Sequence, residues 1–160
     1  MSVFIPERRQ FLAGLGLIGL TAIASCRSVL PTVDGAGASD AAAATFAGIR
    51  SGDGLGAVSA DRKLEQAAAR QAGYMVVAGR MEHTALPGRD FVSRMHAAGI
   101  PGPAAENLAH GRMDIDRLFS IWMDSPPHRR NMLDPRFGSF GLAYAGDGDG
   151  SRYWSLVLAA

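Results

Sequence analysis

The chain has 160 residues with 16 basic and 15 acidic side chains, so its formal net charge is +1 with neutral histidines. This balance argues against nucleic acid as a partner, because nucleic-acid-binding domains carry a basic surface. Cys26 is the single cysteine, so no intramolecular disulfide can form and the fold must depend on packing.

Residues 1–26 have the three parts of a bacterial signal peptide. A basic start with Arg8 and Arg9 precedes an apolar run over residues 11–24 and an exit of small residues. The run holds about 14 residues, too few for a helix that crosses a bilayer, so we expect cleavage rather than permanent spanning. The sequence ERRQFLAG resembles the twin-arginine export pattern, and an ordinary Sec signal with two arginines is the alternative.

The sequence Ile-Ala-Ser-Cys that ends at Cys26 resembles a lipobox, in which the cysteine becomes the lipidated first residue of the mature chain. An incidental cysteine near a conventional cleavage site is the alternative. The lipobox predicts an extracytoplasmic lipoprotein, periplasmic or at the cell surface, whose membrane partner is reached through Cys26. Residues 27–39 are rich in Gly, Ala and Ser and are predicted to be a flexible tether.

Residues 40–160 are predicted to form one domain, since roughly 120 residues suffice for a packed core. Its first half shows helix signals at regular intervals. Ser39 or Asp40 is expected to cap a first helix, a second is expected from Asp61 to Gly79, and a third from Asp90 to Ala98 with Gly99 as its C-cap.

The second half combines two further helices with strands. Asp114 is expected to cap a helix with a one-sided apolar stripe, so Phe119 and Trp122 are predicted to be core residues rather than ligand contacts. Ser125 is expected to cap the next helix with its side-chain oxygen. Beyond residue 135, two segments of alternating apolar residues predict a β-hairpin. Helices followed by a hairpin indicate the α+β class.

Three residues lie in distinctive local sequences: His83 in MEHT, Glu106 in AENLAHG and His128 in SPPHRRN. Two imidazoles and a carboxylate can hold a divalent cation or move a proton. His128 is expected in the first turn of a helix, where the macrodipole favours the neutral ring. Asn107 can hydrogen-bond neighbouring backbone, and all three residues are expected near element ends, where sites are commonly built. The alternative for each histidine is an ordinary surface or core residue.

The order of motifs from residue 41 onward resembles the CAP superfamily, the SCP-like extracellular domain of cysteine-rich secretory proteins, antigen 5 and pathogenesis-related protein 1. It is most similar to the disulfide-free bacterial branch. The matching segments are MEHT, GRDF, AENLA, WMDSPPHRRNML, FGL and YW. The resemblance implies an α-β-α sandwich with a small antiparallel sheet.

The resemblance also implies a cleft lined by two histidines and two acids, which binds a divalent cation such as zinc in some members. His83, Glu106 and His128 match three of these positions. The place of the second acid falls at Ser125, unless the adjacent Asp124 substitutes for it.

Three functions remain open at this point. The resemblance implies binding of sterols, fatty acids or other small apolar ligands in some members, which suits a lipid-anchored module. The second is a metal-dependent hydrolase of the cell envelope, in which His83 and His128 hold zinc and Glu106 acts as general base. The third is a structural or interaction module with a vestigial site. The missing acid, and the lack of an HExxH or GxSxG sequence, favour binding over catalysis.

Overall fold

The computed structural model describes Met1 and residues 34–160. Residues 2–33 hold the predicted export signal with Arg8 and Arg9, the predicted lipidation site Cys26 and most of the predicted tether, so these predictions lie outside the described residues. Within the described residues, no helix combines the length and the apolar character needed to cross a membrane.

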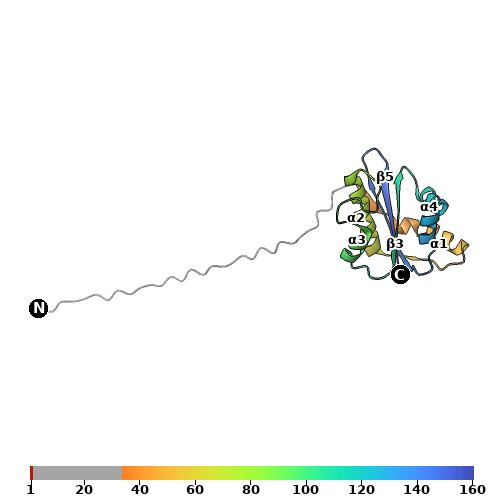
Figure 1. Ribbon diagram of the computed structural model, residues 1–160, viewed down its shortest axis with the longest axis horizontal. Coiled ribbons are helices and arrows are strands. Elements are labelled where there is room, and N and C mark those ends of the chain that lie inside the picture. Colours follow the sequence, from red (N-terminus) through yellow and green to blue (C-terminus); the bar gives the residue numbers. More distant parts are fainter. Residues whose placement is uncertain (2–33) are drawn as a thin grey trace.

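A five-stranded sheet forms the middle of the domain (Figure 1). The order is β1-β4-β5-β3 with antiparallel neighbours, and β2 pairs with β4 in parallel. Leu142 lies opposite Leu156 in the hairpin of β4 and β5, so the predicted hairpin is confirmed. The strands are β1 (Gly35–Gly37), β2 (Ser59–Ala60), β3 (Ala104–Gly111), β4 (Ser139–Gly146) and β5 (Arg152–Ala159).

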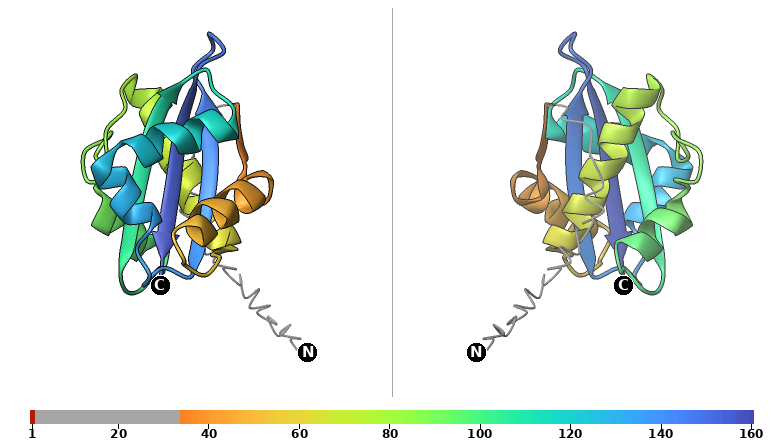
Figure 2. Two further views of the ribbon diagram at one scale, coloured as in Figure 1. Left: turned by 90° about the vertical axis from the view of Figure 1, so that its right-hand side faces the viewer. Right: turned by 90° about the vertical axis from the view of Figure 1, so that its left-hand side faces the viewer.

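Helices cover both faces of the sheet, as the two views in Figure 2 show. One face carries α2 (Arg62–Ala78) and α3 (Phe91–Ala97). The opposite face carries α1 (Ser39–Gly52), α4 (Ile115–Asp124) and α5 (Pro126–Met132). The α-β-α sandwich with a small antiparallel sheet is therefore confirmed, and with it the α+β class.

Helix α2 begins and ends where its sequence signals predict. The Asp61 carboxylate accepts the Leu64 N–H at 2.9 Å, which satisfies a backbone donor that the first helical turn leaves free. Gly79 closes the helix in the left-handed region at φ 63°. The aspartate and glycine thus fix the length of the helix that faces the centre of the sheet.

Gly141 in β4 lets α2 lie directly against the sheet. A Cβ atom at this position would collide with the backbone of Leu64 and Glu65. Ala67 and Ala68 are small and buried in the same interface. The close approach of helix and strand therefore depends on small residues from both elements.

The larger core lies under α1, α4 and α5. Asp114 caps α4 by accepting the Arg117 N–H at 2.8 Å, as predicted. Phe119 and Trp122 are 1% and 0% exposed, which confirms them as core residues. The Trp122 Nε1–H donates to the Leu108 carbonyl at 2.9 Å and so ties α4 to β3.

The sequence pattern does not predict strand β3, which contains Glu106. Burial is continuous from Glu106 to Ala109, because both faces of this strand are covered. A strand buried on both faces does not alternate apolar with polar residues and so lacks the usual sequence signal. The expectation that Glu106 lies near an element end is wrong, since it occupies the strand interior.

Three boundaries also differ from the prediction. Residues 35–37 pair with β4, so they belong to the sheet rather than to a tether that ends at residue 39. The N-cap position of α1 is Ala38. Ser39 lies inside the helix and its hydroxyl accepts the Leu142 N–H at 3.0 Å. The C-cap of α3 is Ala98, and Gly99 follows it at φ 62°.

Candidate functional site

The fold brings His83 and Glu106 into contact and places His128 beside them. His83 lies in the loop after α2, Glu106 in β3 and His128 in α5. The His83 Nδ1 atom is 2.9 Å from Glu106 Oε1. The pKa of His128 is lowered, first by burial and second by the nearby His83. Three residues spread along the sequence therefore share one region of the molecule.

Side chains of two helices hold the backbone of the loop that carries His83. The Gln71 side chain in α2 donates to the Glu82 carbonyl at 2.7 Å. The Arg94 side chain in α3 donates to the His83 carbonyl at 3.1 Å. The His83 side chain is 57% exposed, so its ring reaches solvent although the backbone beneath it is fixed.

Arg94 holds both oxygens of the Glu106 carboxylate. One guanidinium nitrogen donates to Oε2 and another to Oε1, each at 2.8 Å. The two side chains are 6% and 1% exposed, so this is a buried bidentate ion pair. Sequence reasoning did not place Arg94 in the site. Its signal was an arginine three residues after Phe91, on the face that α3 turns toward the core.

The arrangement leaves Glu106 with little capacity for other chemistry. Besides Arg94, Oε1 contacts the His83 ring and Oε2 is 3.5 Å from the Ser155 hydroxyl. A general base needs a free lone pair directed at the proton it takes. The Glu106 lone pairs are used within the protein, which does not fit the role of general base.

The residues present also do not fit a zinc site. Among residues 34–160, no group of three or more histidine, cysteine, aspartate or glutamate side chains is arranged to hold a metal ion. Structural zinc sites use four protein ligands and catalytic sites three. With Glu106 paired to Arg94, only the imidazoles of His83 and His128 remain.

Asn107 supports α5 rather than facing a ligand. Its side chain is fully buried and donates to the His128 carbonyl at 3.1 Å. Its Oδ1 atom accepts from the Asn131 side chain at 2.9 Å. The amide thus fixes the first turn of α5 against β3, so Asn107 positions His128. In the described part of the chain, the His128 Nδ1 atom is buried without a hydrogen-bond partner.

Asp124 and Ser125 do not join this network within residues 34–160. Asp124 is the exposed last residue of α4, and Ser125 occupies the N-cap position of α5. The expectation that the Ser125 oxygen caps the helix is wrong, because no side-chain cap hydrogen bond forms there. Pro127, the second helical residue, has no N–H, and this removes one of the two donors that an N-cap oxygen normally accepts.

A pocket that the sequence did not predict lies on the α1 and α4 side of the sheet. Its volume is about 640 Å³. Its apolar wall includes Ile115, Tyr144 and Trp154, and Arg152 lies at the same wall with its guanidinium 4.2 Å from the Tyr144 ring centre. The pocket combines residues from helices and strands that are distant in sequence.

Comparison with known proteins identifies the family of the chain. A family model described as the cysteine-rich secretory protein family (CAP) matches residues 44–158. YkwD of Bacillus subtilis (strain 168) is 38% identical over 45 residues, which are 28% of this chain and 18% of YkwD. The match therefore spans less than a fifth of that relative.

Two solved structures share the fold. An outer surface protein from Borrelia burgdorferi aligns with a TM-score of 0.68 at 21% identity, over 74% of this chain and 89% of that protein. An extracellular SCP-domain protein from Bacillus anthracis aligns with a TM-score of 0.66 at 20% identity, over 75% of this chain and 39% of that one. At these identities the likeness concerns the fold alone.

Proposed function

The chain belongs to the cysteine-rich secretory protein (CAP) family, and from this premise we propose that it is an extracytoplasmic binding module for a small, mainly apolar ligand. The pocket on the α1 and α4 side of the sheet carries the proposal. Its volume of about 640 Å³ falls among the volumes of roughly 300–1,000 Å³ that ligand pockets have. An aliphatic chain or sterol ring would contact Ile115, Tyr144 and Trp154 there.

The pocket also has charged groups, which suit a ligand with a polar head. Arg152 is held over the Tyr144 ring. Asp114 and Asp116 also line the pocket, and the Thr45 hydroxyl donates to Asp116 at 3.0 Å. An amphipathic ligand would bury its apolar part against the aromatic wall and keep its head among these groups.

Catalysis is the weaker alternative because of the Arg94–Glu106 pair. A hydrolase that uses Glu106 as its base would first have to break a buried ion pair with two short hydrogen bonds. Ligand binding in the pocket on the α1 and α4 side would leave the Arg94–Glu106 ion pair intact.

Export and anchoring form part of the same proposal. Arg8 and Arg9 would direct export, and Cys26 would carry the lipid that holds the module at a membrane. Two proteins with the same fold are described as an outer surface protein and an extracellular protein, which supports an extracytoplasmic location.

The test uses the exported chain with Cys26→Ala, which removes the acylation site and leaves residues 34–160 unchanged. A fluorescent fatty acid, cis-parinaric acid, serves as the probe. Ala41 lines the pocket and is exposed, so Ala41→Trp would fill the pocket without disturbing the core. Ala44→Trp is the control, because Ala44 is an exposed residue of the same helix outside the pocket lining.

We expect saturable binding by the parent chain and the Ala44→Trp control, and loss of binding with Ala41→Trp. Metal analysis and native mass spectrometry of the same preparation separate a metal from an apolar ligand. If Ala41→Trp and Ala44→Trp bind the fatty acid equally well, this pocket is not where the fatty acid binds. A chain that carries stoichiometric metal and takes up no apolar probe would contradict it altogether.

A further inference from the structure

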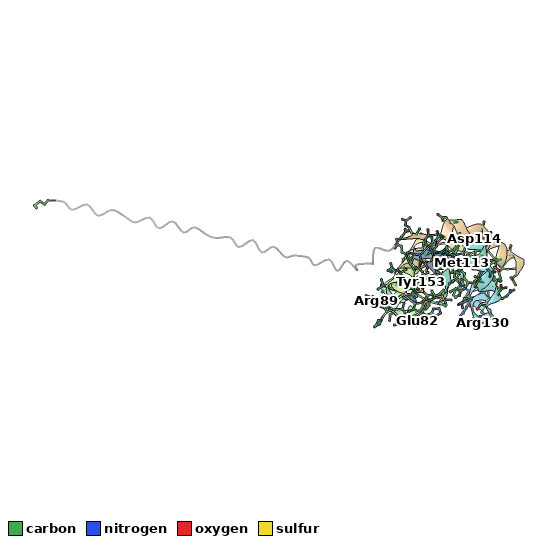
Figure 3. The ribbon with its side chains drawn as sticks, turned by 90° about the horizontal axis from the view of Figure 1, so that it is seen from above. Glu82, Arg89, Met113, Asp114, Arg130 and Tyr153 are labelled. Carbon is green, nitrogen blue, oxygen red and sulfur yellow. The ribbon has the colours of Figure 1, made fainter. Side chains whose placement is uncertain are left out.

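A second concave surface lies on the opposite side of the sheet, between α2 and α3. It has a volume of about 400 Å³. Helix α2 contributes Lys63, Arg70 and Tyr74, and the α3 side contributes Arg89 and Arg94. We call this surface the α2–α3 groove. Arg89 and Asp114 lie on opposite sides of the domain in Figure 3, so the groove is separate from the pocket described above.

The charged side chains that line the groove are all basic. Arg94 is neutralised by its ion pair with Glu106. Within the described part of the chain, the side chains of Lys63, Arg70 and Arg89 form no salt bridge with a carboxylate. Three uncompensated positive charges therefore surround one concave surface in a chain whose net charge is only +1.

The helical spacing directs these groups toward the same space. Lys63, Arg70 and Tyr74 are seven and four residues apart along α2, so they lie on one face of the helix. The Arg89 guanidinium lies 5.7 Å from the centre of the Tyr74 ring, and this contact limits its motion.

Arg94 also shapes the wall of the groove. Its Nε–H donates to the Arg89 carbonyl at 3.0 Å, which fixes the backbone of Arg89 just before α3. Gln66 lies on the same face of α2 and supplies a neutral amide donor. The groove therefore offers positive charge and hydrogen-bond donors on a partly fixed frame.

We propose that the α2–α3 groove binds a phosphate-bearing anion, either a free phosphorylated molecule or the phosphate of a lipid headgroup. A phosphate group holds its negative charge on a compact set of oxygens, one charge in the phosphodiester of a lipid headgroup and close to two in a free phosphomonoester, which suits several cations converging from two sides. The planar guanidinium of arginine can donate two parallel hydrogen bonds to two phosphate oxygens. This inference is independent of the apolar pocket.

The experiment titrates inorganic pyrophosphate into the exported chain with Cys26→Ala and measures binding by calorimetry. A parallel assay measures co-sedimentation with phosphatidylcholine vesicles that contain or lack phosphatidylglycerol. The test variants are Arg70→Ala and Arg89→Ala, both at positions outside the hydrophobic core. Arg117→Ala is the matched control, because Arg117 is an exposed arginine on α4 without a salt bridge in residues 34–160.

We expect each groove variant to weaken binding by roughly threefold to tenfold, as for one charge-assisted contact at a partly exposed site, while the control binds like the parent chain. Raised salt should also weaken binding. Binding of pyrophosphate identifies a site for free phosphorylated molecules. Binding only to vesicles with phosphatidylglycerol, with the same loss in the groove variants, identifies the headgroup as the source.

Three results would overturn the proposal. The first is that neither probe binds. The second is an equal loss in Arg70→Ala and Arg117→Ala, which would mean that diffuse surface charge attracts the anion. The third is that citrate binds as tightly as pyrophosphate, because the groove would then not select phosphate. Thermal melts of all variants check that each one is folded.

Discussion

Replacing Arg94 by methionine tests whether the buried ion pair holds the site together. Arg94→Met keeps an apolar stem and removes four hydrogen bonds: two to Glu106 and one each to the carbonyls of His83 and Arg89. The Glu106 carboxylate would stay in a place where its side chain is 1% exposed. Removing one partner of such a pair costs about 3–5 kcal/mol. A domain of this size is stable by roughly 5–15 kcal/mol, so the loss would be large.

Urea unfolding followed by tryptophan fluorescence measures this loss, since Trp122 and Trp154 are both buried. The double variant Arg94→Met with Glu106→Leu removes both charges, and we expect it to be more stable than Arg94→Met alone. Arg117→Met controls for the loss of an exposed arginine and should change stability by less than about 0.5 kcal/mol. The reasoning fails if Arg94→Met costs no more than Arg117→Met, or if the double variant is the least stable of the three.

Three further predictions concern packing, capping and pH. Gly141→Ala should destabilise the domain by about 3 kcal/mol in urea unfolding because its methyl group meets the α2 backbone, whereas Gly138→Ala meets nothing within 4 Å and should be nearly neutral. Asp114→Ala should cost about 1 kcal/mol by the same assay, and Ser125→Ala much less, because only the aspartate makes a side-chain cap bond. The lowered pKa of His128 means that the folded state binds a proton less readily than the unfolded state. The contribution of neutral His128 to the free energy of unfolding should therefore be complete above pH 6.5, the ordinary pKa of histidine, and should decline as the pH falls below that value. His128→Gln should flatten this decline in thermal melts recorded at a series of pH values.

The helices were predictable because their signals are local. Asp61 and Asp114 each lie three residues before the backbone N–H that they accept. Gly79 adopts the left-handed conformation that closes α2. Local signals of this kind need no knowledge of the partner across the core, so the positions of α2 and α4 follow from sequence.

The features that the sequence did not predict depend on contacts between segments that are distant in the sequence. Strand β3 is buried on both faces, so its sequence does not show which residues face which layer. Arg94 could be recognised as an arginine on an apolar helix face, but its partner Glu106 lies in another element. The proximity of His83 and Glu106 was suggested by the resemblance and not by spacing. The pocket near Trp154 needs α1, α4 and the three strands β1, β4 and β5 together, and no sequence pattern marks it.

Arg94 contacts both the candidate site around Glu106 and the wall of the α2–α3 groove. Its guanidinium neutralises Glu106, and its Nε–H fixes the backbone of Arg89 at the wall of the α2–α3 groove. The Arg94 side chain therefore occupies the Glu106 carboxylate, which could otherwise bind a metal or accept a proton. It also helps to shape the α2–α3 groove, which we propose binds an anion. An acid at position 125 would leave Glu106 bound to Arg94. This second acid would add one candidate ligand to His83 and His128, but Glu106 itself would stay held by the ion pair.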